Sequence, residues 1–359
     1  MSMINNLPDP VLATIYLNAI TIMLLVGILV LYSRLQMHDV IEKRMYSIMV
    51  WMMIFMSMSY IVETCLDERV LVLAPQGYLI EGSIHDIYLN VFCLTWILYA
   101  KYRMYRKIDY IKRKLLVYCI PFLTLLVLNL LDLFIPVFIC YGDDGLMHVT
   151  SIYIVQDIIR YGYMFNTILQ LNRVKKQGIT VRFFSVTPLL ICTVVGLVVH
   201  VLTPSCYTIL SLGMAAGLTL LYAEVANEQS FCDIDTKFFN RSYLNYIFEL
   251  VSKGRYSVNS IMSFKVDDPG KMTEFSELLR KQLPSECEPV RIMQDEIIVL
   301  SKVDERAPLF MVTEDVRAVV DEYNESHTDS PMDVKIGTRI KKRKERGTGF
   351  LLKEVEGYL

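Results

Sequence analysis

The sequence contains no closely spaced cysteine pair. Its eight cysteines stand singly, and no Cys-x-x-Cys motif or cysteine–histidine pairing of the zinc-binding kind occurs. We therefore expect no structural or catalytic metal centre built on cysteine. Cys65, Cys140 and Cys206 fall near the outer ends of apolar segments, where a disulfide is conceivable. Buried free thiols are the alternative state of these residues.

Several signals that would place the chain in other classes are also missing. No lysine or arginine precedes Arg34, and no small-residue cleavage site follows the first apolar run, so we do not expect a cleavable signal peptide. No phosphoacceptor helix or glycine-rich ATP lid follows the last apolar run, which disfavours a sensor histidine kinase. A formal net charge of −2 gives no indication of a nucleic-acid partner.

Apolar residues are abundant and unevenly distributed. They make up 53% of the chain, with a mean hydropathy of +0.38, well above an ordinary soluble protein. The long apolar runs lie within residues 11–226, whereas residues 227–359 have the composition of a soluble domain. The sequence thus predicts a transmembrane sensor region at 1–226 and a separate domain at 227–359.

Seven apolar stretches approach the roughly 20 residues needed to cross a hydrocarbon core. We place these predicted spans at 11–32, 46–65, 82–100, 115–139, 150–171, 184–203 and 206–226. The third and fifth are weaker because they carry ionisable residues, namely Glu81, His85, Asp86, Asp157 and Arg160. The fold class predicted for this part is therefore an all-α membrane bundle of about seven helices.

Basic residues lie on one side of these spans. The connections 33–45, 101–114 and 172–183 hold Arg34, Lys43, Arg44, Lys101, Arg103, Arg106, Lys107, Lys112, Arg113, Lys114, Arg173, Lys175, Lys176 and Arg182. The alternate connections hold Arg69 and the acidic pair Asp143 and Asp144. Because basic loops stay in the cytoplasm, we expect a multi-pass plasma-membrane (bacterial inner-membrane) protein with its N-terminus outside and residues 227–359 in the cytoplasm. The basic cluster at 101–114 is interpreted as an anchor to membrane lipid headgroups.

Polar residues inside the predicted spans each need an explanation, because they are costly in hydrocarbon. Asp86, Asn129, Asp132, Asp157 and Arg160 all fall toward the outer half of the membrane under this topology. Asp157 and Arg160 are three residues apart and share a helix face, as do Asn129 and Asp132. One interpretation is hydrogen bonding that holds the bundle together. The other is an outward-facing pocket for a small polar ligand or ion.

The last part of the chain shows a regular order of elements. A helix is expected at 236–253, followed by a strand at 256–266 and a helix from Pro269 to Leu283. Segments 289–293 and 296–302 are typical of a hairpin, and a helix at 313–326 precedes a strand at 333–341. After the leading helix, the order is β-α-β-β-α-β, which predicts an α+β domain of the ferredoxin-like kind.

Four segments of this domain resemble, in order, motifs of the GGDEF domain of diguanylate cyclases. Residues 233–241 (DIDTKFFNR) resemble the opening motif of that family, and 264–268 (FKVDD) resemble its first strand. Residues 291–297 (RIMQDEI) resemble the signature hairpin, with Arg291, Asp295 and Glu296 retained. Gly337 lies in a segment similar to the late strand. The resemblance covers about 110 residues, and in bacteria such domains commonly follow membrane sensor regions.

The resemblance implies chemistry that this sequence only partly supports. A cyclase joins two GTP molecules with the help of divalent metal ions, which the family holds with carboxylates on the first strand and the hairpin. Here Lys265 occupies the first-strand metal position, and Met293 and Gln294 replace two glycines. The guanine-contact loop expected after Met272 is absent, and so is the product-inhibition motif at 284–287. An alternative alignment would offer Asp267 or Asp268 with Asp295 and Glu296 as metal ligands.

The leading hypothesis is a membrane signalling receptor whose degenerate GGDEF-like domain acts by dimerisation, nucleotide contact or protein contact. It implies no cofactor, a possible small polar extracellular ligand and a homodimer formed through the cytoplasmic domain. The first alternative is an active diguanylate cyclase that uses Mg²⁺ and GTP to make cyclic di-GMP. The second is a transporter with a regulatory domain, although Gly/Pro-broken spans in two halves are not evident.

Overall fold

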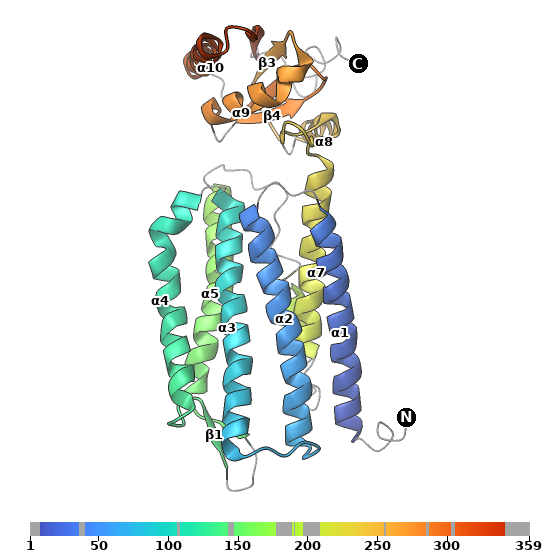
Figure 1. Ribbon diagram of the computed structural model, residues 1–359, viewed down its shortest axis with the longest axis vertical. Coiled ribbons are helices and arrows are strands. Elements are labelled where there is room, and N and C mark those ends of the chain that lie inside the picture. Colours follow the sequence, from blue (N-terminus) through green and yellow to red (C-terminus); the bar gives the residue numbers. More distant parts are fainter. Residues whose placement is uncertain are drawn as a thin grey trace. The chain divides into compact units, whose positions relative to one another are not determined.

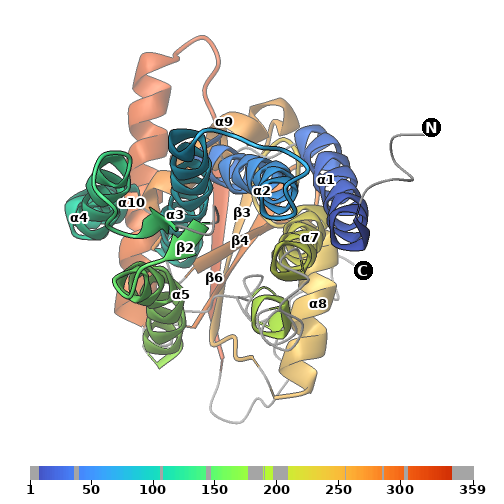
Figure 2. The same cartoon turned by 90° about the horizontal axis from the view of Figure 1, so that it is seen from below.

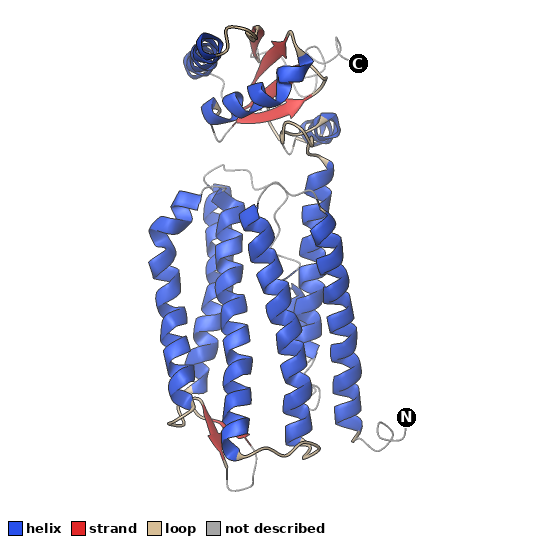
Figure 3. Cartoon of the chain, viewed as in Figure 1, coloured by secondary structure: helices blue, strands red, loops and turns tan. Residues whose placement is uncertain are grey.

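The computed structural model describes residues 8–35, 40–105, 108–142, 147–176, 189, 191–196, 209–254, 256–284, 287–302 and 306–341. The chain divides into two compact units, Met1–Ala226 and Asn227–Leu359, which are described separately below. The first unit is almost entirely helical, and the second mixes helices and strands (Figure 3).

The first unit is a bundle of long helices (Figure 1). They are α1 (Asp9–Arg34), α2 (Val40–Asp67), α3 (Pro75–Tyr105), α4 (Ile108–Asp132), α5 (Tyr153–Lys176) and α7 (Ile209–Ser230), whose last residues belong to the second unit. Between α4 and α5 the strands β1 (Ile139–Tyr141) and β2 (Met147–Val149) form an antiparallel hairpin. Helix α3 packs against α2, α4 and α5, which makes it the centre of this bundle (Figure 2).

Within the described residues, four helices are long and apolar enough to cross a membrane. They are Val11–Arg34, Val40–Asp67, Leu115–Asp132 and Ile209–Ser230. Their outward faces carry exposed apolar side chains such as Met23 and Leu116, which are 73% and 74% exposed. Several polar side chains, including Asn18 and Glu42, are buried instead. A surface that is apolar outside and polar inside is consistent with a membrane protein.

The structure corrects the bounds of two predicted spans. Helix α3 continues to Tyr105, so Lys101 and Arg103 belong to that helix and are buried rather than lying in a cytoplasmic loop. Helix α4 ends at Asp132, not at residue 139, because the carboxylate of Asp132 accepts hydrogen bonds from the backbone that turns into β1. Most of the predicted span 184–203, the turn at 203–205 and the tail 342–359 lie outside the described residues.

A short helical segment, 191–196, packs closely on α7. A Cβ atom added at Gly213 would lie 2.6 Å from the carbonyl oxygen of Cys192, so only glycine permits this approach of two backbones. Small residues at a helix contact are a common feature of membrane bundles, in which packing at short distance replaces the hydrophobic effect.

The second unit is built on one four-stranded sheet. Its elements are α8 (Arg241–Ser252), β3 (Ser260–Val266), the short 3₁₀ turn η2 (Pro269–Lys271), α9 (Met272–Gln282), β4 (Cys287–Arg291), β5 (Glu296–Ser301), α10 (Arg306–Ser326) and β6 (Val334–Ile340). The strand order is β4-β5-β3-β6, and each neighbouring pair is antiparallel. Apolar side chains of the sheet and of α9 and α10 form the core, with Phe264 and Phe275 fully buried.

Two helices of this unit begin at residues other than those predicted. The helix predicted from 236 begins at Arg241, because the Asn240 side chain accepts a hydrogen bond from Tyr243 N at 3.2 Å and caps it. The helix predicted from 313 begins at Arg306. The remaining elements follow the expected order after α8, with small shifts at their ends.

Gly337 lies in close contact with a serine side chain on the neighbouring strand. It lies opposite Ser263 in the β3–β6 register, and an added Cβ would lie 2.6 Å from Ser263 Oγ. We expect Gly337→Ala to destabilise the protein by about 1–3 kcal/mol, the usual cost of overpacking. In a Ser263→Ala background, which removes the clashing oxygen, the same substitution should cost much less. Thermal unfolding of the four proteins checks this, and equal losses in both backgrounds would contradict it.

Candidate functional sites

A buried ion-pair cluster lies between α3 and α5. The Nη2 atom of Arg160 is 2.6 Å from Asp86 Oδ1, and both side chains are at most 5% exposed. Its Nη1 atom is 3.3 Å from Asp157 Oδ1, the pairing on one helix face that the sequence predicts. Arg160 also donates to Asn90 Oδ1 and to the hydroxyl of Tyr153. Three of the five predicted membrane-site residues therefore meet in one cluster.

The other two predicted residues, Asn129 and Asp132, lie outside this cluster and make contacts within the bundle. Asn129 donates to Gln156 Oε1 at 3.1 Å, which joins α4 to α5. Asp132 accepts hydrogen bonds from the backbone nitrogens of residues 137, 138 and 139 at 2.6–3.3 Å. Both contacts fit the interpretation that polar groups hold the bundle together. Asn90, Tyr153 and Gln156 were not singled out from the sequence, because neutral polar residues in apolar runs are too common to be diagnostic.

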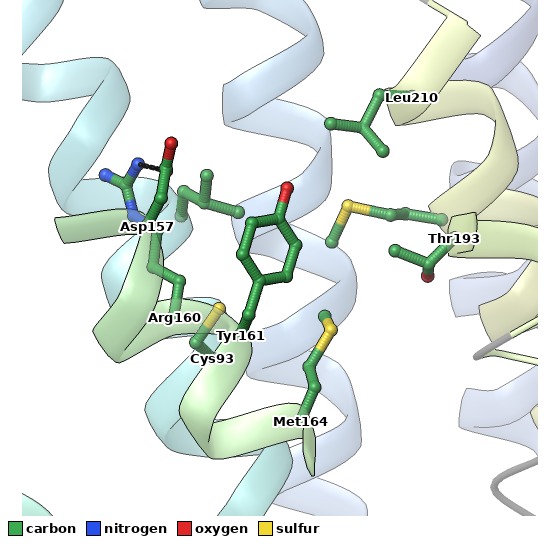
Figure 4. Close-up of a pocket in the computed structure, with 9 residues that line it drawn as sticks. Cys93, Asp157, Arg160, Tyr161, Met164, Thr193 and Leu210 are labelled. Carbon is green, nitrogen blue, oxygen red and sulfur yellow. Dashed lines mark hydrogen bonds and ion pairs between the residues drawn. The ribbon is translucent and has the colours of Figure 1, made fainter. Parts of the chain in front are cut away.

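A small cavity opens beside the Arg160 cluster. It measures about 40 Å³ and is lined from α3, α5, segment 191–196 and α7 by Leu89, Cys93, Asp157, Arg160, Tyr161, Met164, Thr193, Leu210 and Met214. In Figure 4 the ring of Tyr161 stands across the cavity, with Asp157 and Arg160 on one side and Thr193 and Leu210 on the other. The carboxylate of Asp157 is 39% exposed and faces a wall that is otherwise mostly apolar.

A second polar cluster joins α2 to α3. The hydroxyl of Ser59 donates to Glu81, and His85 Nδ1 lies 3.9 Å from Glu63 Oε2. The His85 ring packs edge-on against Tyr60 at a centroid distance of 4.5 Å. Among the described residues, no group of three or more His, Cys, Asp or Glu side chains is arranged to hold a metal ion.

Near the other end of the bundle, another ion pair is fully buried. Arg103 Nη1 is 2.9 Å from Glu42 Oε1, with both side chains at most 2% exposed, and it connects α3 to the start of α2. This pair is not predicted from the sequence, because both residues fall in segments that the basic residues mark as loops near the membrane surface. Seven cysteines in the described part of the chain, including Cys65 and Cys140, are free thiols, and Cys206 lies outside the described residues.

The hairpin of the second unit carries the residues that resemble the GGDEF signature. Strand β4 ends at Arg291 and β5 begins at Glu296, so Met293, Gln294 and Asp295 form the turn. Lys265 Nζ lies 3.3 Å from Asp295 Oδ2, which is the pairing expected from the sequence. Glu296 is opposite Lys265 in the register of the sheet, and its side chain is buried.

The alternative metal ligand on the first strand is also paired with a lysine. Lys335 Nζ on β6 lies 3.1 Å from Asp267 Oδ1. The hydrogen bond from Lys335 lowers the pKa of Asp267 below its usual value, and the same contact raises the pKa of Lys335. Metal sites for Mg²⁺ require several free oxygen ligands. Asp295 and Asp267 are thus each paired with a lysine, whose ammonium group lies where a metal ion would have to approach the carboxylate.

Arg291 connects the hairpin to the segment that opens the domain. Its Nη1 atom is 2.9 Å from both Asp233 Oδ1 and Asp235 Oδ2, and its other nitrogens donate to the carbonyl oxygens of Met293 and Gln294. Burial opposes ionisation of Asp233, but hydrogen bonds from Thr236 and Arg291 prevail and lower its pKa. These contacts hold the backbone of the hairpin turn close to the opening segment of the domain.

Comparisons with known proteins give a limited result. No protein-family model matches the chain, and no curated protein matches it. Among solved structures, it is similar to the S helix-GGDEF-EAL region of Vibrio cholerae LapD bound to c-di-GMP, with 16% sequence identity and a TM-score of 0.30. The match covers 39% of this chain and 37% of that one, so this chain spans little more than a third of its length. A likeness of that size assigns no activity to this chain.

Proposed function

We propose that this chain is a bacterial membrane signalling receptor with a catalytically inactive, GGDEF-like output domain. Seven helices would cross the plasma (inner) membrane with the N-terminus outside, and the ferredoxin-like second unit would lie in the cytoplasm. Signals would leave through dimerisation, nucleotide contact or protein contact of that unit. A small polar ligand in the helical unit would be the input.

The arrangement of the helices supports seven crossings. Besides the four apolar helices, α3 and α5 are 31 and 24 residues long, enough for a core of about 30 Å. Figure 1 shows α5 and α7 running in the same direction, and the helical segment 191–196 lies between them in the sequence. Asp86 of α3 is paired with Arg160 of α5, which also contacts Asp157, and this pairing lowers the cost of placing these residues in a membrane.

The topology of the second unit supports the resemblance to GGDEF domains. The element order β-α-β-β-α-β and the sheet order β4-β5-β3-β6 are those of a ferredoxin-like domain. The FKVDD segment begins on the last three residues of β3 and continues beyond it, and Phe264 and Lys265 pair with Ile297 and Glu296 of the RIMQDEI hairpin, as the resemblance requires. Arg291 ends β4, Asp295 lies in the turn and Glu296 begins β5, which supports the resemblance of 291–297 to the signature hairpin.

The single observation that carries the inactive assignment is the Lys265–Asp295 ion pair. An ammonium group stands beside the carboxylate that would have to bind the metal, and it supplies the neutralising charge itself. Two further features agree with this. The turn has side chains at Met293 and Gln294 where the family has glycine, and only the three residues of η2 separate Asp268 from α9, so the guanine-contact loop has no place.

Manganese binding tests this assignment. Titration of the full-length protein in lipid nanodiscs, followed by the electron paramagnetic resonance of free Mn²⁺, should give the same binding curve for the wild type and for Asp295→Asn. The amide variant keeps the shape of the side chain and removes its charge, so a difference between the two curves would show that the Asp295 carboxylate binds the metal. A saturable Mn²⁺ site that is present in the wild type and lost in Asp295→Asn would overturn the inactive assignment.

A further inference from the structure

The hydrogen bonds of Arg160 indicate which charge the adjoining cavity can accept. A guanidinium group has five N–H donors. In this chain Nε donates to Asn90, Nη1 to Tyr153 and Asp157, and Nη2 to both the backbone and a side-chain oxygen of Asp86. All five donors therefore have protein acceptors. An anion entering the cavity would have to displace one of them.

The carboxylates of the cluster, in contrast, have less than a full set of charge and hydrogen-bond partners. Arg160 provides one formal positive charge against the two formal negative charges of Asp86 and Asp157. Asp86 Oδ2 is buried and has no hydrogen-bond partner among the described residues. Asp157 faces the cavity with a partly exposed carboxylate. The three side chains together carry a formal charge of −1, and Asp157 is the carboxylate of this cluster that lines the cavity, which favours a cation there.

Size and wall chemistry narrow the kind of cation. A volume of about 40 Å³ exceeds the space of one water molecule and is far below the roughly 150 Å³ of a cavity that holds benzene. Most lining side chains are apolar or thioether groups, and the side-chain oxygens belong to Asp157, Tyr161 and Thr193. The Thr193 hydroxyl already donates to the carbonyl of Leu189. Hard metal cations prefer about six oxygen ligands, so this wall suits them poorly.

We propose that the cavity binds a small alkylammonium ion, of the size of methylammonium. Its N–H groups would donate to Asp157, and its positive charge would lie near the ring of Tyr161, where a cation–π contact is favourable. Its methyl group would lie against the apolar wall formed by Leu210 and Met214. This inference rests on the proposed receptor function, for which it names the class of input.

The test is thermal unfolding of the full-length protein in detergent with methylammonium chloride. At a hundred-fold excess over Kd the melting temperature should rise by about 5 °C. Asp157→Asn should abolish this rise. Asp9→Asn, which removes the same charge from an exposed position at the start of α1, should retain it. Leu210→Phe, which fills the cavity and leaves its charges unchanged, should also abolish the rise, so a folding defect of one variant does not decide the result.

Three outcomes would overturn the proposal. They are an equal rise with sodium chloride, a rise with sodium acetate that methylammonium does not produce, and a methylammonium effect that persists in Asp157→Asn. The cavity lies in the helical unit, so the comparison of Asp157→Asn with Asp9→Asn reports on a site in that unit. Its failure would leave the inactive output domain untouched, whereas an Mn²⁺ site lost in Asp295→Asn would overturn the inactive assignment without affecting the cation site.

Discussion

Replacing Arg160 with methionine is expected to destabilise the helical unit by about 3–5 kcal/mol, the typical cost of removing one partner from a buried ion pair. Asp86 would be left buried with a formal charge and no counterion, since its side chain is only 2% exposed. Methionine keeps most of the volume of arginine, so the loss would reflect charge and hydrogen bonds rather than a cavity. The stability of Arg160→Lys should fall between those of the wild type and Arg160→Met, because lysine keeps the positive charge but cannot donate hydrogen bonds to all the acceptors of Arg160.

A double-mutant cycle separates this effect from general damage to the bundle. Arg160→Met combined with Asp86→Leu removes both charges and should recover a large part of the stability lost by Arg160→Met alone. Chemical or thermal unfolding of the four proteins in one detergent gives the coupling. Additive losses in the double variant would contradict a direct pairing of Asp86 with Arg160.

Replacing Asp132 with alanine is expected to have the second large effect. Three backbone N–H groups would lose their acceptor, namely that of Val137, which is partly buried, and those of Phe138 and Ile139, which are buried. Each unsatisfied buried donor costs about 1–3 kcal/mol, so the variant should lose several kcal/mol and the turn from α4 into β1 should loosen.

Asp132→Asn provides the matched control. It keeps one side-chain oxygen that can accept these hydrogen bonds, so its loss should be clearly smaller than that of Asp132→Ala. Hydrogen exchange at residues 137–139 measures the effect locally, and thermal unfolding measures it globally. If both variants exchange at the wild-type rate, Asp132 does not hold this turn and the assignment is wrong.

Apolar run length was enough to predict α1, α2, α4 and α7, because a membrane helix has to be apolar over about 20 residues. It could not predict that Lys101 and Arg103 continue α3. Basic residues at the end of an apolar run are usual in loops, and the partner Glu42 lies 61 residues away in the sequence. Contacts of that separation depend on how helices pack, which a single sequence does not specify.

In the candidate sites, too, contacts within one helix could be predicted from the sequence, whereas contacts between distant segments mostly could not. Helix periodicity predicts that Asp157 and Arg160 share a face, and in the structure the two side chains form an ion pair. The pairing of Asp86 with Arg160 depends on the packing of α3 against α5. The sequence predicts only that the two residues lie at a similar depth in the membrane. The Lys265–Asp295 contact could be expected, since the resemblance placed both residues beside one hairpin. The Arg291 contacts to Asp233 and Asp235 were not expected, because they join segments more than 50 residues apart.

The most direct test of the inactive output domain is cyclic di-GMP formation from GTP by the full-length protein in lipid, with Mg²⁺ or Mn²⁺. A cation at a metal-binding position removes stabilisation of the transition state that the metal would supply. We expect no product above the level of Asp295→Ala, and no gain from Lys265→Asp, because the guanine-contact loop would still be absent. Sustained turnover by the wild type that disappears in Asp295→Ala would contradict the account.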